Sequence, residues 1–351
     1  AGLEEQLEVH YPLIPLEKTN VSYMTTAEPI NFSVDLAYYL APNGLNQSYL
    51  IPVYVYRGTS IVDNKTFPLR NTFIPATAFP IDVFTYEERP IAREEKNVSV
   101  ENISADRGTG DKPSNDAGAS WMGLLASPPL SGSKNNAQGF VNELSAAGWA
   151  VKFNWGSEVY PNAWESDWNQ NENSWIDNVD IVFYTGHADE TGWQLSPPKD
   201  GWLHRSEVQR RYGDGDAEWI TIAACGPLED RDIMCPNNPI DAVNNWGPVF
   251  NGLHGLLGYA SVTADNQDEG RRFTAYMRQG DTVVNSWFRA AREIQGSYNG
   301  WSCPYGNDVY AAALVPYRGT ISAENDHLWG YGTVSSDISN PDKFWLIWTH
   351  C

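Results

Sequence analysis

The sequence predicts an α/β protein with a mostly parallel sheet flanked by helices, preceded by an N-terminal β-rich domain. Two continuous apolar runs, 180–187 and 219–226, have the length and composition of buried parallel strands. After residue 119, such runs alternate with amphipathic segments, which is the pattern of a parallel sheet covered by helices. Residues 1–104 contain strand patterns and no amphipathic segment of helix length.

The N-terminal region is predicted to form the β-rich domain over residues 1–104. Residues 49–56 are rich in β-branched and aromatic side chains, which is typical of a strand, and a turn is predicted at 57–59. A second strand is predicted at 78–86, where the proline favours an edge position. Residues 105–118 are polar and rich in Gly, Pro and Asp, so we expect a linker there.

The α/β domain is predicted over residues 119–351, with a β-rich C-terminal extension from about residue 300. Its strands are expected at 121–126, 149–154, 180–187, 219–226, 255–262, 309–315 and 343–348. An amphipathic helix is predicted at 137–147 and is followed by Gly148, a typical C-terminal stop. Further helices are predicted within 271–294.

The composition limits the class of protein. The 351 residues are 42% hydrophobic and 19% charged, which is typical of a globular chain rather than a disordered one. The formal net charge of −21 argues against a nucleic-acid partner, because nucleic-acid binding needs a basic surface. No apolar run approaches the length of about 18 residues typical of a transmembrane helix, so no membrane span is expected.

The distribution of N-glycosylation sequons predicts a compartment. All six lie in the first 104 residues, at Asn20, Asn31, Asn46, Asn64, Asn97 and Asn102. Such clustering favours a glycosylated region of a secreted or cell-surface protein. The alternative is a β-domain rich in Ser, Thr and Asn with accidental matches.

The cysteines are Cys225, Cys235, Cys303 and Cys351. Four cysteines can form two disulfides in an oxidising compartment, but a catalytic Cys225 has to stay reduced. A Cys235–Cys303 disulfide is then preferred, because both residues lie in Cys-Pro loops whose direction the proline sets. The sequence alone leaves the connectivity open.

A histidine and a cysteine stand at the ends of the two apolar runs. His187 ends the first run and Cys225 ends the second. In an open α/β sheet the carboxyl ends of neighbouring strands face one crevice, so adjacent strands would bring these side chains together. Cys225 would then be the nucleophile and His187 the general base and acid. Gly186 and Gly226 are the candidate oxyanion donors.

Other interpretations of these residues remain open. A cysteine at a strand end is more often a small buried side chain than a nucleophile, although the paired pattern favours catalysis. His254 precedes the 255–262 run and is the best alternative base. Asp189 and Glu190 are candidates to orient His187, and each is equally typical of a solvated loop.

Several motifs occur in the order found in one family of peptidases. They are Phe-Tyr-Thr-Gly-His at 183–187, Ile-Ala-Ala-Cys-Gly at 222–226, the run 256–265, and a helix ending at 287–293. Over about residues 119–295 the chain resembles the caspase-like superfamily of cysteine peptidases, most closely its CHAT- and gingipain-like branch. The resemblance implies a caspase-like sheet and hydrolysis of a polypeptide substrate by a His/Cys dyad without a cofactor.

Two features beside the motifs bear on activity and specificity. Ala188 stands where the resembled family usually has glycine after the histidine. Asp265 and Asp268 lie in an acidic loop after the 255–262 run, where they would bind a basic substrate side chain or help to hold a structural Ca²⁺. A solvated loop is the simplest alternative.

The leading hypothesis is therefore a secreted cysteine endopeptidase whose N-terminal domain is a prodomain, or a module for self-association or surface attachment. The alternative is a non-catalytic extracellular surface or assembly protein on a peptidase-like fold, in which Cys225 is unreactive or disulfide-bonded. A third hypothesis is a carbohydrate-binding or glycoside-cleaving protein, for which paired carboxylates such as those in 164–167 would be required.

Overall fold

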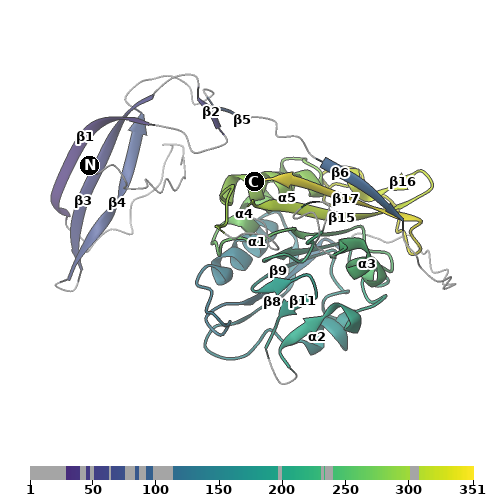
Figure 1. Cartoon of the computed structure of the whole chain (residues 1–351). Helices are drawn as coiled ribbons and strands as arrows, with labels where there is room; N and C mark the ends of the chain where they lie inside the picture. Colours follow the sequence, from purple (N-terminus) through teal and green to yellow (C-terminus); the bar gives the residue numbers. More distant parts are fainter. Residues whose placement is uncertain are drawn as a thin grey trace. The chain divides into compact units, whose positions relative to one another are not determined.

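The chain divides into two compact units, residues 1–88 and 89–351, which are described separately. The computed structural model (Figure 1) describes residues 29–39, 45–47, 51–62, 65–75, 84–86, 92–97, 114–196, 200–230, 233, 240–300 and 308–351.

The described part of the first unit consists of antiparallel strands. Strands β1 (Pro29–Tyr39), β3 (Ile51–Val62) and β4 (Lys65–Pro75) form one sheet in that order, and β2 (Leu45–Gln47) pairs with β5 (Phe84–Tyr86). The turn predicted at 57–59 is wrong, because β3 continues through it with only a shift of register between Tyr56 and Gly58. A bulge of this kind lets a strand bend without ending.

The six sequons fall in different places. Asn31 lies in β1 and Asn46 in β2. Asn97 is the last residue of β6 (Ala92–Asn97) in the second unit. The remaining three, Asn20, Asn64 and Asn102, lie outside the described residues.

The boundary between the units differs from the one expected at residue 104. Strand β6 (Ala92–Asn97) pairs antiparallel with β17 (Lys343–His350), so it belongs to the sheet of the second unit. The Arg93 guanidinium lies 4.6 Å from the Trp345 ring centroid. The sequence of β6 is almost entirely polar, which is common for an edge strand and gives no apolar signal to read.

The second unit is built on a nine-stranded sheet in the order β6-β17-β15-β14-β13-β9-β7-β8, with β16 paired to β15. The remaining strands are β7 (Asp116–Met122), β8 (Ala150–Ser157), β9 (Ile181–Thr185), β13 (Trp219–Ala223), β14 (Gly255–Tyr259), β15 (Tyr310–Arg318) and β16 (Ile321–Ser322). Neighbouring strands from β8 to β14 are parallel, whereas β15, β16, β17 and β6 pair antiparallel. The mixed α/β architecture with helices against a large sheet is confirmed.

Two hydrophobic cores cover the two faces of this sheet. Alternate residues of β9 contribute to different cores, with Phe183 in one and Tyr184 in the other, as the two-residue period of a strand requires. The first core holds α1 (Ser133–Ala146), α4 (Glu269–Arg278) and α5 (Val283–Ile294), and the Phe140 ring of α1 lies 5.0 Å from the Phe183 ring.

The second face is covered by an aromatic cluster instead of long helices. Trp193 stacks on Trp246 at 5.3 Å and meets Trp168 edge-on at 5.1 Å. These side chains come from β11 (Gly192–Gln194), α3 (Ala242–Trp246) and α2 (Ser166–Asn169). The same side carries β10 (Ala188–Asp189) and β12 (Trp202–His204), which pair with β11 in a small sheet. These three of the chain's 15 tryptophans are therefore core residues.

Two predicted elements are displaced. The strand expected at 121–126 is β7 at Asp116–Met122, so it begins inside the predicted linker, and 123–126 form a loop. Helix α1 starts at Ser133, earlier than expected, and Gly148 follows it with a φ of +88°, as a C-terminal stop requires. The antiparallel strands of the C-terminal extension, β15 and β17, lie where they were predicted.

Candidate functional site

The strand order creates a crevice at one edge of the sheet. Along the chain, β7 is followed by β8 on one side and then by β9 on the other side, so successive connections leave β7 in opposite directions. In open α/β sheets, ligands bind outside the carboxyl ends of the strands at such a reversal. The loops after β7, β9, β13 and β14 therefore form the candidate site.

His187 and Cys225 lie at equivalent places on two adjacent strands of this edge. Strands β9 and β13 are parallel neighbours in which Thr185 is opposite Ala223. His187 and Cys225 each follow two residues later, and both side chains are partly buried. Among the described residues no hydrogen bond joins the His187 ring to Cys225 Sγ. Catalytic contacts of this kind often form only when substrate is bound.

The His187 ring is oriented by a backbone carbonyl from the loop after β7. Nε2 lies 2.7 Å from the Pro128 oxygen. A carbonyl oxygen only accepts hydrogen bonds, so Nε2 carries the proton and Nδ1 of the neutral ring is left as the proton acceptor. Asp189, a predicted orienting residue, instead accepts bonds from the Thr191 N–H and hydroxyl.

Cys225 contacts the loop after β14. It is a free thiol, and its Sγ lies 3.4 Å from the Thr263 nitrogen and 3.5 Å from the Thr263 oxygen. The adjacent Gly226 has a φ of +63°, a left-handed conformation that glycine adopts readily. This turn leaves Cys225 at the end of the strand rather than inside the sheet.

The two predicted oxyanion donors differ in what the structure allows. The Gly226 N–H donates to the Ser261 oxygen at 3.0 Å, so in this structure it is engaged and does not face a substrate. At Gly186 a Cβ atom would lie 2.1 Å from the Tyr184 hydroxyl oxygen, which explains why glycine is needed there. Gly186 is the remaining candidate of the two.

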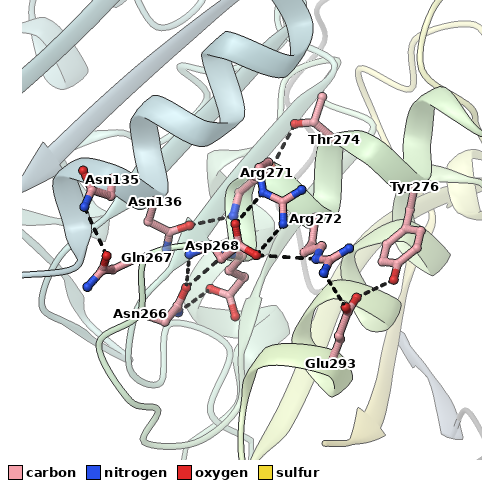
Figure 2. Close-up of polar contacts among 12 residues, drawn as sticks. Asn135, Asn136, Asn266, Gln267, Asp268, Arg271, Arg272, Thr274, Tyr276 and Glu293 are labelled. Carbon is pink, nitrogen blue, oxygen red and sulfur yellow. Dashed lines mark hydrogen bonds and ion pairs between the residues drawn. The ribbon is translucent and has the colours of Figure 1, made fainter. Parts of the chain in front are cut away.

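Asp265 and Asp268 are engaged in contacts within the protein. Asp265 Oδ2 accepts the Gly132 N–H at 2.7 Å and thereby ties this loop to the start of α1. Figure 2 shows Asp268 between Arg271 and Arg272, with ion-pair distances of 2.5 Å and 3.4 Å. With its charge compensated by two arginines of α4, Asp268 is poorly placed to attract a basic substrate group.

Further polar contacts join the same loop to α1, as Figure 2 also shows. Asn135 donates to Gln267 at 3.2 Å, and Asn136 accepts the Gly270 N–H at 2.6 Å. Three connections thus run from residues 265–270 to the start of α1. The loop predicted to bind substrate is a structural connection between two helices.

Glu229 is the buried acid of the Cys225 loop. Its side chain is 4% exposed, and its Oε1 lies 2.6 Å from where a Gly226 Cβ atom would be. Burial, together with the charges of Glu190 and Asp189, raises the pKa of Glu229 to about 8. The acidic character of the site thus comes from the β9 and β13 loops, not from the loop after β14.

His254 is excluded as the partner of Cys225. It precedes β14 at the opposite edge of the sheet, is 1% exposed, and contacts Asp326 through Nδ1 at 2.7 Å. Its Nε2 lies 3.6 Å from Asp337. Burial lowers the pKa of His254, but the hydrogen bonds and charges of Asp326 and Asp337 outweigh it and raise that pKa above its ordinary value.

The raised pKa of His254 predicts a pH-dependent contribution to stability. A folded-state pKa above the unfolded value of 6.5 means that the imidazolium stabilises the fold fully below pH 6.5 and that this contribution is lost as pH rises through the folded pKa. His254→Gln should therefore reduce the free energy of unfolding by about 3 kcal/mol at pH 5.5 and by less at alkaline pH. Urea unfolding at several pH values tests this, and an equal loss at every pH would contradict it.

The structure bears only in part on the predictions about a disulfide, a metal ion, a membrane span and paired carboxylates. Cys235 and Cys303, the predicted disulfide, lie outside the described residues. Among the described residues there is no group of three or more His, Cys, Asp or Glu side chains placed to hold a metal ion. The part of the chain that the structure describes also has no helix of the length and apolarity needed to cross a bilayer. In the 164–167 segment, Glu165 is 1% exposed and accepts a bond from Asn169 within α2.

Sequence reasoning missed three groups of the site: the Pro128 carbonyl, the Thr263 backbone and the Glu229 carboxyl. The first two are main-chain groups, so no residue type signals them. Glu229 stands four residues after Cys225 and could have been noticed by its position. Its burial is decided by packing and has no signature in the sequence.

Comparison with models of protein families identifies a family for the second unit. A family model described as "Domain of unknown function (DUF6345)" matches residues 120–350, which is more than half of the chain. The match runs from within β7 to the end of β17 and hence includes every loop of the candidate site. No curated protein matches this chain.

Proposed function

Because this chain belongs to the DUF6345 family, whose description names no activity, we propose a function from its site: cysteine endopeptidase with Cys225 as nucleophile and His187 as general base and acid. The observation that supports this most is the register of β9 and β13, which puts both residues at equivalent positions beyond adjacent parallel strands. The contact of His187 with Pro128 supports the proposal independently, because it leaves Nδ1 as the proton acceptor.

The proposed reaction is acyl transfer. His187 Nδ1 takes the proton of the Cys225 thiol, and the thiolate attacks the carbonyl carbon of the peptide bond. The imidazolium then gives that proton to the leaving amine as the carbon–nitrogen bond breaks. In the second half, His187 takes a proton from water, the hydroxide attacks the thioester, and the acid product and the free thiol are released.

A caspase-like fold is part of this proposal. The order β8-β7-β9-β13-β14 of the parallel strands supports it, as do the antiparallel strands that follow on the β14 side. The His motif follows β9, which pairs with β7, and the Cys motif follows β13, the next strand in the sheet, in the order that the resemblance implies. Fold alone does not decide activity.

The substrate is proposed to be a polypeptide with a basic residue near the cleaved bond. Glu229 lies beneath the turn that carries Cys225, and Asp189 and Glu190 lie close enough to raise its pKa. Glu229 keeps its proton up to about pH 8, so the negative charges that favour a cationic side chain are those of Asp189 and Glu190. This replaces the role expected of Asp265 and Asp268, whose carboxylates are already bound within the protein.

An extracellular location and a glycosylated N-terminal region are also proposed, and they rest on the sequons alone. Asn31 and Asn46, in the strands of the first unit, are the sites to examine first. The first unit would then be a prodomain or a module for self-association or attachment. Intact-mass measurement before and after removal of N-glycans tests this part.

Thiol chemistry tests the proposed dyad directly. The native, unreduced protein is treated with iodoacetamide, and the adducts are mapped by mass spectrometry in the wild type and in His187→Ala. We expect fast alkylation at Cys225 that slows about tenfold or more without His187, because general-base assistance is typically worth more than that. A Cys225 that is unreactive, or equally reactive in both proteins, would favour the non-catalytic surface or assembly protein.

A further inference from the structure

Both polar groups of the Thr263 backbone, the N–H and the carbonyl, contact the sulfur of Cys225, the candidate nucleophile. The Thr263 N–H donates to Cys225 Sγ, with 3.4 Å between nitrogen and sulfur, and the thiol lies 3.5 Å from the Thr263 carbonyl oxygen. An N–H directed at sulfur stabilises the thiolate, which is the reactive form. A carbonyl oxygen at the same sulfur accepts the S–H and favours the thiol. The position of Thr263 therefore affects the reactivity of Cys225.

Thr263 lies in an irregular segment after β14, so no strand pairing fixes it. The next residue, Ala264, is held instead by the side chain of Gln295. Gln295 Oε1 accepts the Ala264 N–H at 3.0 Å, and Nε2 donates to the Ala264 oxygen at 3.1 Å. The side-chain amide thus takes the place of a neighbouring strand for this one residue.

Gln295 is well suited to hold a loop in one position. It caps the end of α5, its N–H donates to Ala291 at 2.8 Å, and its side chain is 7% exposed. Its Nε2 also donates to Glu269 at 3.4 Å, and Glu269 is 1% exposed at the start of α4. The amide is therefore fixed by two helices of the first core before it reaches the loop.

We propose that Gln295 is a positioning residue for the Cys225 nucleophile: it fixes Ala264 and so keeps the Thr263 N–H on Cys225 Sγ. Gln295 does not itself touch the sulfur. The inference rests on the proposed cysteine-peptidase function for its biological meaning, although the contact can be tested on the thiol alone.

The chemistry of the contact requires an amide at position 295. One end must accept from the Ala264 N–H while the other end donates to its carbonyl. A carboxylate can accept but not donate, and it would place a second carboxyl group against Glu269. Gln295→Glu and Gln295→Met thus preserve most of the side-chain volume while removing one or both of these bonds.

The test is the pH profile of Cys225 alkylation by iodoacetamide, mapped by mass spectrometry, in the wild type, Gln295→Met and Gln295→Glu. Asn169→Leu is the matched control, because Asn169 is also a buried amide, 4% exposed, but in α2 against the other core. Thermal unfolding is recorded for every protein, so that loss of stability and loss of positioning are measured separately.

We expect the pH of half-maximal alkylation to rise by about one unit in both Gln295 variants, with alkylation at pH 7 about tenfold slower, because the N–H bond to the charged thiolate is stronger than the S–H bond to the carbonyl. Asn169→Leu should lower the melting temperature without moving this pH. An unchanged profile in a folded Gln295 variant overturns the inference, even where His187→Ala still slows alkylation and the proposed function stands. A shifted profile together with no effect of His187→Ala supports the positioning contact and overturns the dyad. A variant that melts earlier with a wild-type profile assigns Gln295 a structural role only.

Discussion

Replacement of Cys225 by alanine should abolish peptide hydrolysis, and replacement of His187 by alanine should reduce it by about 10³-fold. In the proposed reaction Cys225 supplies the nucleophile, and no other residue takes over bond formation to the carbonyl carbon. His187 would move the proton in both half-reactions, and its ring is already held by Pro128 in the orientation that leaves Nδ1 free. The two losses should not add, because the residues act as one unit.

The assay uses fluorescein-labelled casein and a mixed peptide library analysed by mass spectrometry. Cys351→Ala is the matched control, because Cys351 is a second cysteine, buried and 3% exposed, to which the proposed reaction gives no role. Cleavage after Arg or Lys that requires both Cys225 and His187 is the expected result. Hydrolysis that persists in Cys225→Ala, or a wild type that cleaves nothing, would argue against a peptidase.

Glu229→Gln should make the protein more stable at alkaline pH than the wild type. Burial and the charges of Glu190 and Asp189 raise the pKa of Glu229 from 4.5 to about 8. The folded state therefore keeps a proton that the unfolded state loses above pH 4.5, so stability falls as pH rises from 4.5 to about 8. A glutamine has no proton to lose, and the expected gain at pH 8.5 is on the order of 3 kcal/mol.

The measurement is the difference in unfolding free energy between Glu229→Gln and wild type at pH 5 and at pH 8.5. The difference between the two proteins is the quantity to use, because other buried acids also make the unfolding free energy of each protein depend on pH. Asp177 and Asp180 are two of these, with pKa values raised to about 8 and about 7. Asp342→Asn removes an exposed carboxylate at the opposite edge of the sheet and serves as the control. If the difference in unfolding free energy between Glu229→Gln and wild type does not grow with pH, the Glu229 carboxyl ionises in the folded protein without loss of stability.

The strands of the second unit show which elements local sequence predicts and which it does not. The apolar runs at 180–187 and 219–226 predict β9 and β13, because a strand buried on both faces is apolar along most of its length. Strand β6 gave no such signal, since an edge strand with polar side chains has the composition of a loop. Its assignment to this sheet depended on pairing with β17, about 250 residues further along the chain.

The candidate site, like the strands, could be predicted from local sequence only in part. The sequence by itself determined that a histidine and a cysteine follow two buried strands, because side-chain chemistry and strand periodicity are both local properties. Only the tertiary structure decided that these strands are neighbours, that a Pro128 carbonyl orients His187, and that Asp265 accepts the Gly132 N–H at the start of α1. These contacts join residues far apart in sequence through backbone groups and packing. The type of a single residue encodes neither its backbone contacts nor its packing.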